Sequence, residues 1–126
     1  MEKAEIQALI REAFAALKFA YVPYSHFHVG AALRGKNGQV FRGCNIENAS
    51  YTPTNCAERT ALFKAVSEGV REFDAIAIVG SKAGEKNTLV TGPCGVCRQA
   101  LYEFGGPGLT VIMAKSEEDY IVTTLG

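Results

Sequence analysis

The sequence predicts one α/β domain, residues 1–126, in which helices flank a mixed sheet of about five strands. Strand-like segments alternate with helix-like segments after an opening hairpin, which is typical of a layered α/β fold. The length of 126 residues fits a single domain, and the sequence shows no internal repeat, linker or low-complexity run. An apolar content of 48% is enough for a core and for buried subunit contacts.

Three segments have helical patterns. The first is amphipathic, and it is expected to end before Pro23. Its apolar positions recur at helical spacing and are Ile6, Leu9, Ile10, Ala13, Phe14 and Leu17. The second covers residues 56–68, which Gly69 ends, and the third covers residues 94–104. We expect the first helix to pack on the sheet or against a neighbouring subunit.

Strands are expected between these helices. They cover residues 27–33, 39–44, 73–79 and 109–114, with a short last strand at residues 120–122. Asn37 and Gly38 separate the first two strands and form a hairpin signal, because both residue types tolerate positive φ. Residues 45–55 and 80–91 are expected to be loops.

Charge and composition exclude several classes of partner. The chain carries 13 basic and 13 acidic residues and has no net charge, which argues against a nucleic-acid-binding surface. The N-terminal residues do not form a signal peptide, and no apolar run approaches membrane-spanning length. We therefore expect a cytoplasmic protein, in which closely spaced cysteines indicate metal or redox chemistry rather than a disulfide.

Three cysteines have the arrangement of a catalytic zinc site. Cys94 and Cys97 have the Cys-x-x-Cys spacing with which two thiolates bind one metal ion, and Cys56 supplies a third thiolate. Three protein ligands leave one coordination position open for water, whereas a structural zinc site has four. A redox pair is the alternative, but it leaves the Cys-Ala-Glu sequence that begins at Cys56 unexplained. A structural zinc site would need a fourth ligand, for which the candidates are Cys44, His26 and His28.

Glu58 has two interpretations. It follows Cys56 by two residues, so a metal on that cysteine would bring the carboxylate close to the bound water, where it could transfer protons. Alternatively, Asn55 caps the helix and Glu58 completes a capping box. The first interpretation agrees with the zinc-deaminase signature, in which a Cys/His-x-Glu motif precedes Pro-Cys-x-x-Cys.

The resemblance extends over nearly the whole chain. Residues 24–32, 43–48, 55–61 and 93–97 carry motifs that resemble the small, homotetrameric, zinc-dependent cytidine deaminases of pyrimidine salvage. The resemblance implies a three-layer fold and one Zn²⁺ per subunit. It also implies hydrolysis of cytidine and deoxycytidine to uridine and deoxyuridine with release of ammonia, in which water activated by the zinc ion attacks C4 of the base. Glu58 would be the proton shuttle.

The same resemblance assigns substrate-binding residues. Phe27 would lie against the pyrimidine, Asn45 and Glu47 would bind the ribose hydroxyl groups, and the Ala57 backbone N–H would meet the base carbonyl. Tyr51 would reach a neighbouring subunit's site. Spacing alone would indicate that Phe27 is a core aromatic residue and that Asn45 and Glu47 are polar loop residues.

Arg59 and Arg98 each follow a ligand motif. In the family, arginines at these positions contact the first cysteine ligand. Three thiolates around Zn²⁺ give the site a net negative charge, and guanidinium donors would withdraw part of it. The alternative is a solvated helix face.

Two alternatives to cytidine deamination stay open at this point. One is a related aminohydrolase for another base or a nucleoside antibiotic, and the other is a non-enzymatic structural zinc module. The resembling family usually continues into a Leu-Pro segment and an aromatic residue that closes a neighbouring site, whereas this sequence ends at Gly126.

Overall fold

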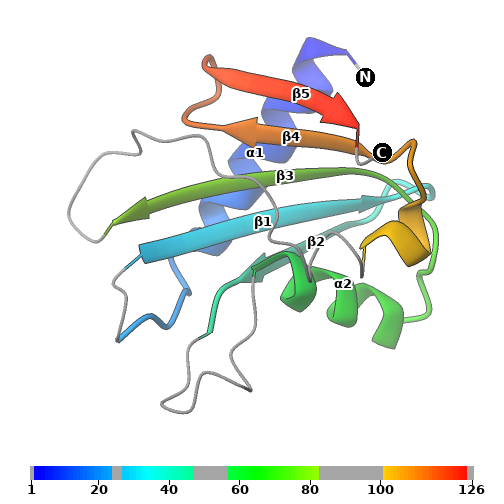
Figure 1. Ribbon diagram of the computed structural model, residues 1–126, viewed down its shortest axis with the longest axis horizontal. Helices are drawn as coiled ribbons and strands as arrows, with labels where there is room; N and C mark the ends of the chain where they lie inside the picture. Colours follow the sequence, from blue (N-terminus) through cyan, green and yellow to red (C-terminus); the bar gives the residue numbers. More distant parts are fainter. Residues whose placement is uncertain (1, 24–26, 47–56, 83–100, 125–126) are drawn as a thin grey trace.

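A five-stranded mixed sheet forms the middle layer of the computed structural model (Figure 1), which describes residues 2–23, 27–46, 57–82 and 101–124. The strand order is β2-β1-β3-β4-β5. The elements in chain order are α1 (Lys3–Leu17), β1 (Phe27–Gly35), β2 (Val40–Cys44), α2 (Ala57–Ser67), β3 (Phe73–Lys82), β4 (Thr110–Ala114) and β5 (Tyr120–Thr124). Residues 101–105 are also helical, which agrees with the end of the helix predicted at residues 94–104; the rest of that prediction lies outside the described residues. None of the helices in these ranges is long and apolar enough to cross a membrane.

The pairing confirms the predicted mixed sheet. β1 is antiparallel to β2 and β3, β3 is parallel to β4, and β4 is antiparallel to β5. The prediction was wrong about the end of β3, because residues 80–82 continue the strand where a loop was expected. They do so because the start of β1 pairs with them, from Val29 opposite Gly80 to Phe27 opposite Lys82. The rest of that predicted loop lies outside the described residues.

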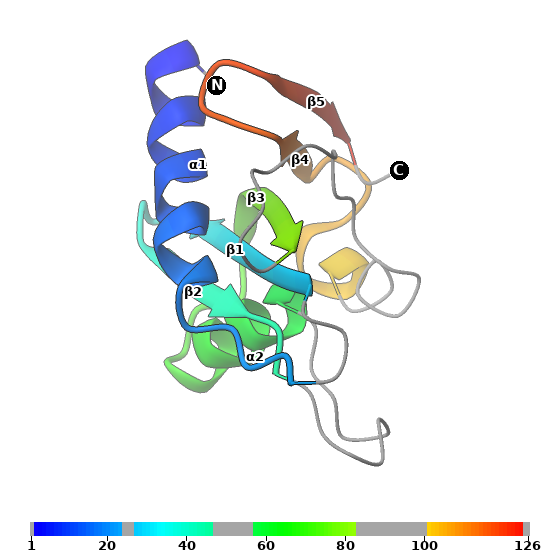
Figure 2. The same ribbon diagram turned by 90° about the vertical axis from the view of Figure 1, so that its left-hand side faces the viewer.

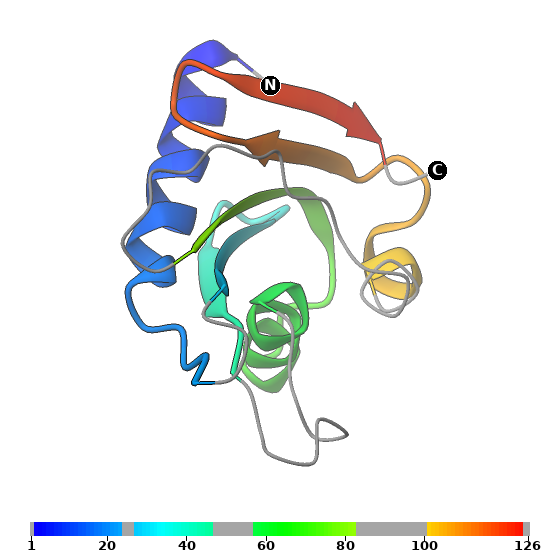
Figure 3. The same cartoon turned by 60° about the vertical axis from the view of Figure 1, so that its left-hand side comes forward.

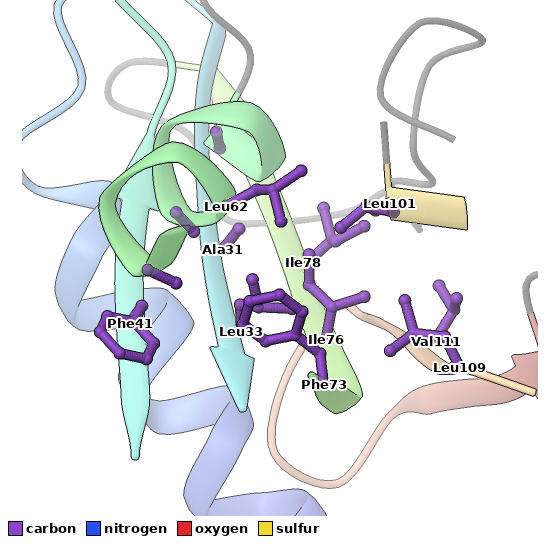
Figure 4. Packing of buried hydrophobic residues seen from close by; sticks show 13 residues of the cluster. Ala31, Leu33, Phe41, Leu62, Phe73, Ile76, Ile78, Leu101, Leu109 and Val111 are labelled. Atoms are coloured by element: carbon purple, nitrogen blue, oxygen red, sulfur yellow. The ribbon is translucent and has the colours of Figure 1, made fainter. Parts of the chain in front are cut away.

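Helices cover both faces of the sheet. Figures 2 and 3 show α1 on one side and α2, with residues 101–105, on the other. On the α1 face the helix packs against small side chains of the central strands, among them Ala32, Ala77 and Val79. On the α2 face, Leu62 and Leu101 converge on larger side chains, including Leu33, Ile76 and Ile78 (Figure 4). The strands therefore carry apolar residues on both faces.

Two glycines let the helices approach the sheet closely. A Cβ on Gly30 would lie 2.1 Å from the Ala13 carbonyl oxygen of α1. On the opposite face, a Cβ on Gly43 would lie 2.2 Å from the Ala57 carbonyl oxygen and 2.5 Å from the Ala61 nitrogen of α2. No side chain fits at these distances, so the first turns of α2 rest directly on the β2 backbone.

An ion-pair network fixes the N-terminal end of α1. The Arg34 guanidinium donates to both carboxylate oxygens of Asp74, at 2.9 Å each, and to Glu5 on α1 at 2.7 Å. The hydrogen bonds to Asp74, and next those to Glu5, raise the pKa of Arg34 above its already high value. The bond from Arg34 in turn lowers the pKa of Glu5. This network joins α1 to β1 and β3 away from α2.

We predict that Gly43→Ala lowers the free energy of unfolding by about 1–3 kcal/mol, because the added methyl group collides with backbone atoms of α2. Chemical denaturation measures this loss. The matched control is Gly108→Ala, since a Cβ there meets no atom within 4 Å. Equal stability of the Gly43 variant and the parent would contradict the close packing of α2 on β2.

Candidate active site

One end of the sheet gathers four of the residues that the sequence predicts for the site. Phe27 begins β1, Asn45 directly follows β2, and Ala57 and Glu58 begin α2. The antiparallel pairing of β1 with β2 places Gly30 opposite Cys44, so the start of one strand lies beside the end of the other. Because α2 rests on β2 through its first residues, its N-terminal turn lies over this part of the sheet.

Phe27 extends from the α2 face of β1. Ala31 and Leu33 belong to the core on that face, and Val29 packs against the same cluster. Since side chains alternate along a strand, Phe27 lies on that face with Val29. It is half-buried. The structure thus places an aromatic side chain on the same face of the sheet as the N-terminal end of α2.

Asn45 is anchored to β1 by its side chain. Its Oδ1 accepts a hydrogen bond from the Val29 backbone N–H at 2.9 Å, and its Nδ2 donates to the Phe27 backbone carbonyl at 2.9 Å. Spacing did not reveal these bonds, because they depend on how β2 ends beside β1. A primary amide has two N–H groups and two lone pairs on oxygen, so these two bonds do not exhaust its capacity.

The start of α2 buries a carboxylate. Ala57 has no exposed surface and Glu58 is 4% exposed. An acidic residue in the first turn interacts favourably with the positive end of the helix dipole. A capping role would also place Glu58 near this helix end, but the predicted cap, Asn55, lies outside the described residues. Burial of Glu58 agrees with its predicted role in proton transfer in a closed site.

Arg59 is half-buried, and its Nε is shielded from solvent. This burial disagrees with the solvated helix face that was the alternative interpretation. The remaining predicted site residues lie outside the described residues and are Cys56, Cys94, Cys97, Glu47, Tyr51 and Arg98. Cys56 immediately precedes Ala57 in the sequence.

Two candidates for a fourth zinc ligand lie on the other face of the sheet. Cys44 is paired with Gly30, and a Cβ on Gly30 would point toward α1. His28 is two residues from Gly30 on the same strand. Alternation therefore directs both side chains toward the α1 face, away from α2. Burial raises the pKa of the Cys44 thiol, which keeps it in the neutral form. The third candidate, His26, lies outside the described residues.

The donor set fits zinc. Cys56, Cys94 and Cys97 offer three sulfur ligands, and thiolates are soft donors that suit Zn²⁺. A set of three leaves a coordination position for water or substrate. In the described part of the chain, no three His, Cys, Asp or Glu side chains come together closely enough to hold a metal ion.

Comparison with known proteins agrees with these features. Residues 3–114 match the family described as the cytidine and deoxycytidylate deaminase zinc-binding region. The chain belongs to this deaminase family. The deaminase is 47% identical over 121 residues to the cytidine deaminase of Sporosarcina psychrophila, covering 96% of this chain and 85% of the relative. It is 61% identical over 97 residues to that of Halalkalibacterium halodurans, covering 77% and 70%.

A solved structure shows the same fold. The deaminase superposes on the crystal structure of cytidine deaminase from Burkholderia pseudomallei with a TM-score of 0.84 and 51% identity. The match covers 94% of this chain and 91% of that one. The predicted cytidine-deaminase-like fold is therefore confirmed, and the matched zinc-binding region identifies Zn²⁺ as the cofactor.

We predict that Glu58→Gln keeps the fold and the zinc content but lowers kcat at least roughly a hundredfold, the low end of the effect of acid–base catalysis. Steady-state deamination assays, with zinc measured on the same sample, check this. Glu68→Gln is the matched control, because Glu68 is exposed just beyond α2. Near-normal turnover, with a loss of stability on the order of 1 kcal/mol, would indicate a helix cap instead.

Proposed function

We propose that this protein hydrolyses cytidine and deoxycytidine to uridine and deoxyuridine and releases ammonia. The observation that carries the proposal is the buried Glu58 carboxylate at the start of α2, two residues after Cys56 in a chain of the zinc-binding deaminase family. Relatives named cytidine deaminase, 47% and 61% identical, favour this substrate over another base or a nucleoside antibiotic.

Cys56, Cys94 and Cys97 would hold the metal ion. When bound, Zn²⁺ supplies Lewis-acid activation of a water molecule. Glu58 accepts a proton from this water as the water oxygen bonds to C4 of the pyrimidine. The carboxylic acid then gives the proton to N3. A second proton passes from the hydroxyl group now on C4, through Glu58, to the exocyclic amine as the C4 carbonyl forms and the C4–N bond breaks. Water is consumed and ammonia leaves, so the atoms and the charges balance.

The other residues bind and orient the nucleoside. The Phe27 ring lies against the pyrimidine, where an aromatic face provides apolar contact. The Ala57 backbone N–H donates to the base carbonyl, and Asn45 and Glu47 bind sugar hydroxyl groups. Tyr51 reaches the site of a neighbouring subunit.

Arg59 and Arg98 moderate the charge of the metal site. Three thiolates on one divalent ion carry a net negative charge, which opposes loss of a proton from the activated water. Guanidinium donors to the sulfur atoms withdraw part of that charge. The shielded Nε of Arg59 supports an inward position for this side chain.

Two different kinds of protein are disfavoured. A structural zinc module would need a fourth ligand, and both Cys44 and His28 belong to the opposite face of the sheet. A nucleic-acid-editing enzyme would be expected to carry a basic excess, whereas the net charge here is zero. We place the single-domain enzyme in the cytoplasm, in pyrimidine salvage.

We further propose that the protein is a homotetramer with sites near the subunit boundaries. Large apolar side chains remain exposed on the single chain, among them Phe19, Tyr21 and Phe63, at 76%, 59% and 51%. Such surface supports association between copies. We predict that sedimentation equilibrium gives the mass of four chains. A stable monomer that deaminates cytidine at the full rate would exclude sites shared between subunits.

We predict that the purified parent protein contains about one Zn²⁺ per chain and that Cys94→Ala loses both the metal and cytidine deamination. Metal analysis and ammonia release on one sample measure both. Cys44→Ala is the matched control and should keep both properties, since its side chain lies on the α1 face. Full zinc content and activity in Cys94→Ala would overturn the ligand assignment, and a zinc-loaded parent without activity would overturn the proposed reaction.

A further inference from the structure

The Asn45 side chain continues the hydrogen bonding of β1 where β2 leaves the sheet. The strand pairing ends with Gly30 opposite Cys44. Beyond this pair, the Asn45 amide binds the Val29 N–H and the Phe27 carbonyl, each at 2.9 Å. One oxygen acceptor and one nitrogen donor are what the backbone of a longer β2 would offer to this edge. The amide therefore substitutes for the next peptide groups of the strand.

The backbone of Asn45 explains why the side chain is needed. Its N–H still donates to the Val29 carbonyl at 3.2 Å, but its own carbonyl accepts from the Tyr21 N–H at 3.0 Å. The next residue, Ile46, forms a parallel bridge with Tyr21. The main chain thus turns toward the segment that follows α1, while the side chain stays on β1.

This arrangement holds the first residue of β1 from both sides. On one edge, Phe27 is paired with Lys82 of β3. On the other edge, its carbonyl is tied to Asn45 Nδ2. Since the direction of a side chain at a strand end follows the local backbone, the bond to Asn45 limits how far the Phe27 ring can move.

We propose that Asn45 is a positioning residue for Phe27, fixing the aromatic side chain against which the pyrimidine lies. The proposal rests on the proposed function, and it deepens it, because it gives Asn45 a role that does not require a sugar hydroxyl group. The two roles are compatible. The amide keeps a second N–H and a second lone pair after its bonds to β1.

Two variants separate the parts of this contact. Asn45→Ala removes both bonds to β1. Asn45→Asp keeps an acceptor for the Val29 N–H but sets a carboxylate oxygen against the Phe27 carbonyl. Asn37→Ala is the matched control, because Asn37 makes comparable local bonds, to Gln39, at the far end of β1.

Amide hydrogen exchange measured by NMR on the zinc-loaded protein tests the anchor itself. We expect exchange at Val29 to accelerate at least about tenfold in Asn45→Ala and to stay slow in Asn45→Asp and Asn37→Ala. The ring signals of Phe27 should shift in both Asn45 variants and not in Asn37→Ala. Unchanged Val29 exchange or unchanged Phe27 signals in Asn45→Ala would overturn the proposal.

Kinetics with two substrates separate positioning from sugar binding. Cytidine is compared with 2′,3′,5′-trideoxycytidine, which has no sugar hydroxyl group. The enzyme concentration is high enough to measure the rate of the parent protein on both substrates. We expect both Asn45 variants to lower kcat/KM by roughly ten- to a hundredfold on either substrate, the scale of a misplaced substrate. If kcat/KM falls on cytidine but changes by no more than about twofold on the trideoxy compound, Asn45 acts only through the sugar.

The two levels of the hypothesis fail separately. A parent protein that does not deaminate cytidine contradicts the proposed function. The exchange and ring signals still decide in that case whether Asn45 holds Phe27 in place.

Discussion

The contact between α2 and β2 at Gly43 is the constraint on which the candidate site depends. Backbone atoms of the helix lie where a Cβ would otherwise project from the strand. This spacing places the first turn of α2 directly on the sheet, and Ala57 and Glu58 in that turn are buried. A buried carboxylate is costly unless the surrounding groups hold it in place. The close contact thus connects the packing of the fold to the group proposed to move protons.

The two faces of the sheet have different roles: one holds α1 in place, and the other carries the candidate site. On the α1 side, small side chains and the Arg34 ion-pair network hold the helix against the strands. On the α2 side lie Phe27, Glu58 and the helix that directly follows Cys56. Cys44 and His28 are close to the site in sequence but belong to the α1 face, because neighbouring residues of a strand point in opposite directions.

The sheet also has to end beside the site without leaving its backbone unsatisfied. The pairing of β2 with β1 ends at Gly30, three residues after β1 begins at Phe27, and the Asn45 amide supplies a donor and an acceptor to the unpaired part of that edge. The main chain is then released toward Tyr21. In this way one side chain both terminates a strand and lies where the nucleoside is proposed to bind.

The sequence by itself determined the first two helices, the centres of the strands and the family. Periodicity and motif spacing are local properties, so Glu58 and the three cysteines could be proposed for the site without coordinates. Tertiary structure decided the extension of β3 to Lys82, because a strand continues as far as a partner pairs with it. It also decided the face on which Cys44 lies and the bonds of Asn45, since both depend on how distant segments align across the sheet.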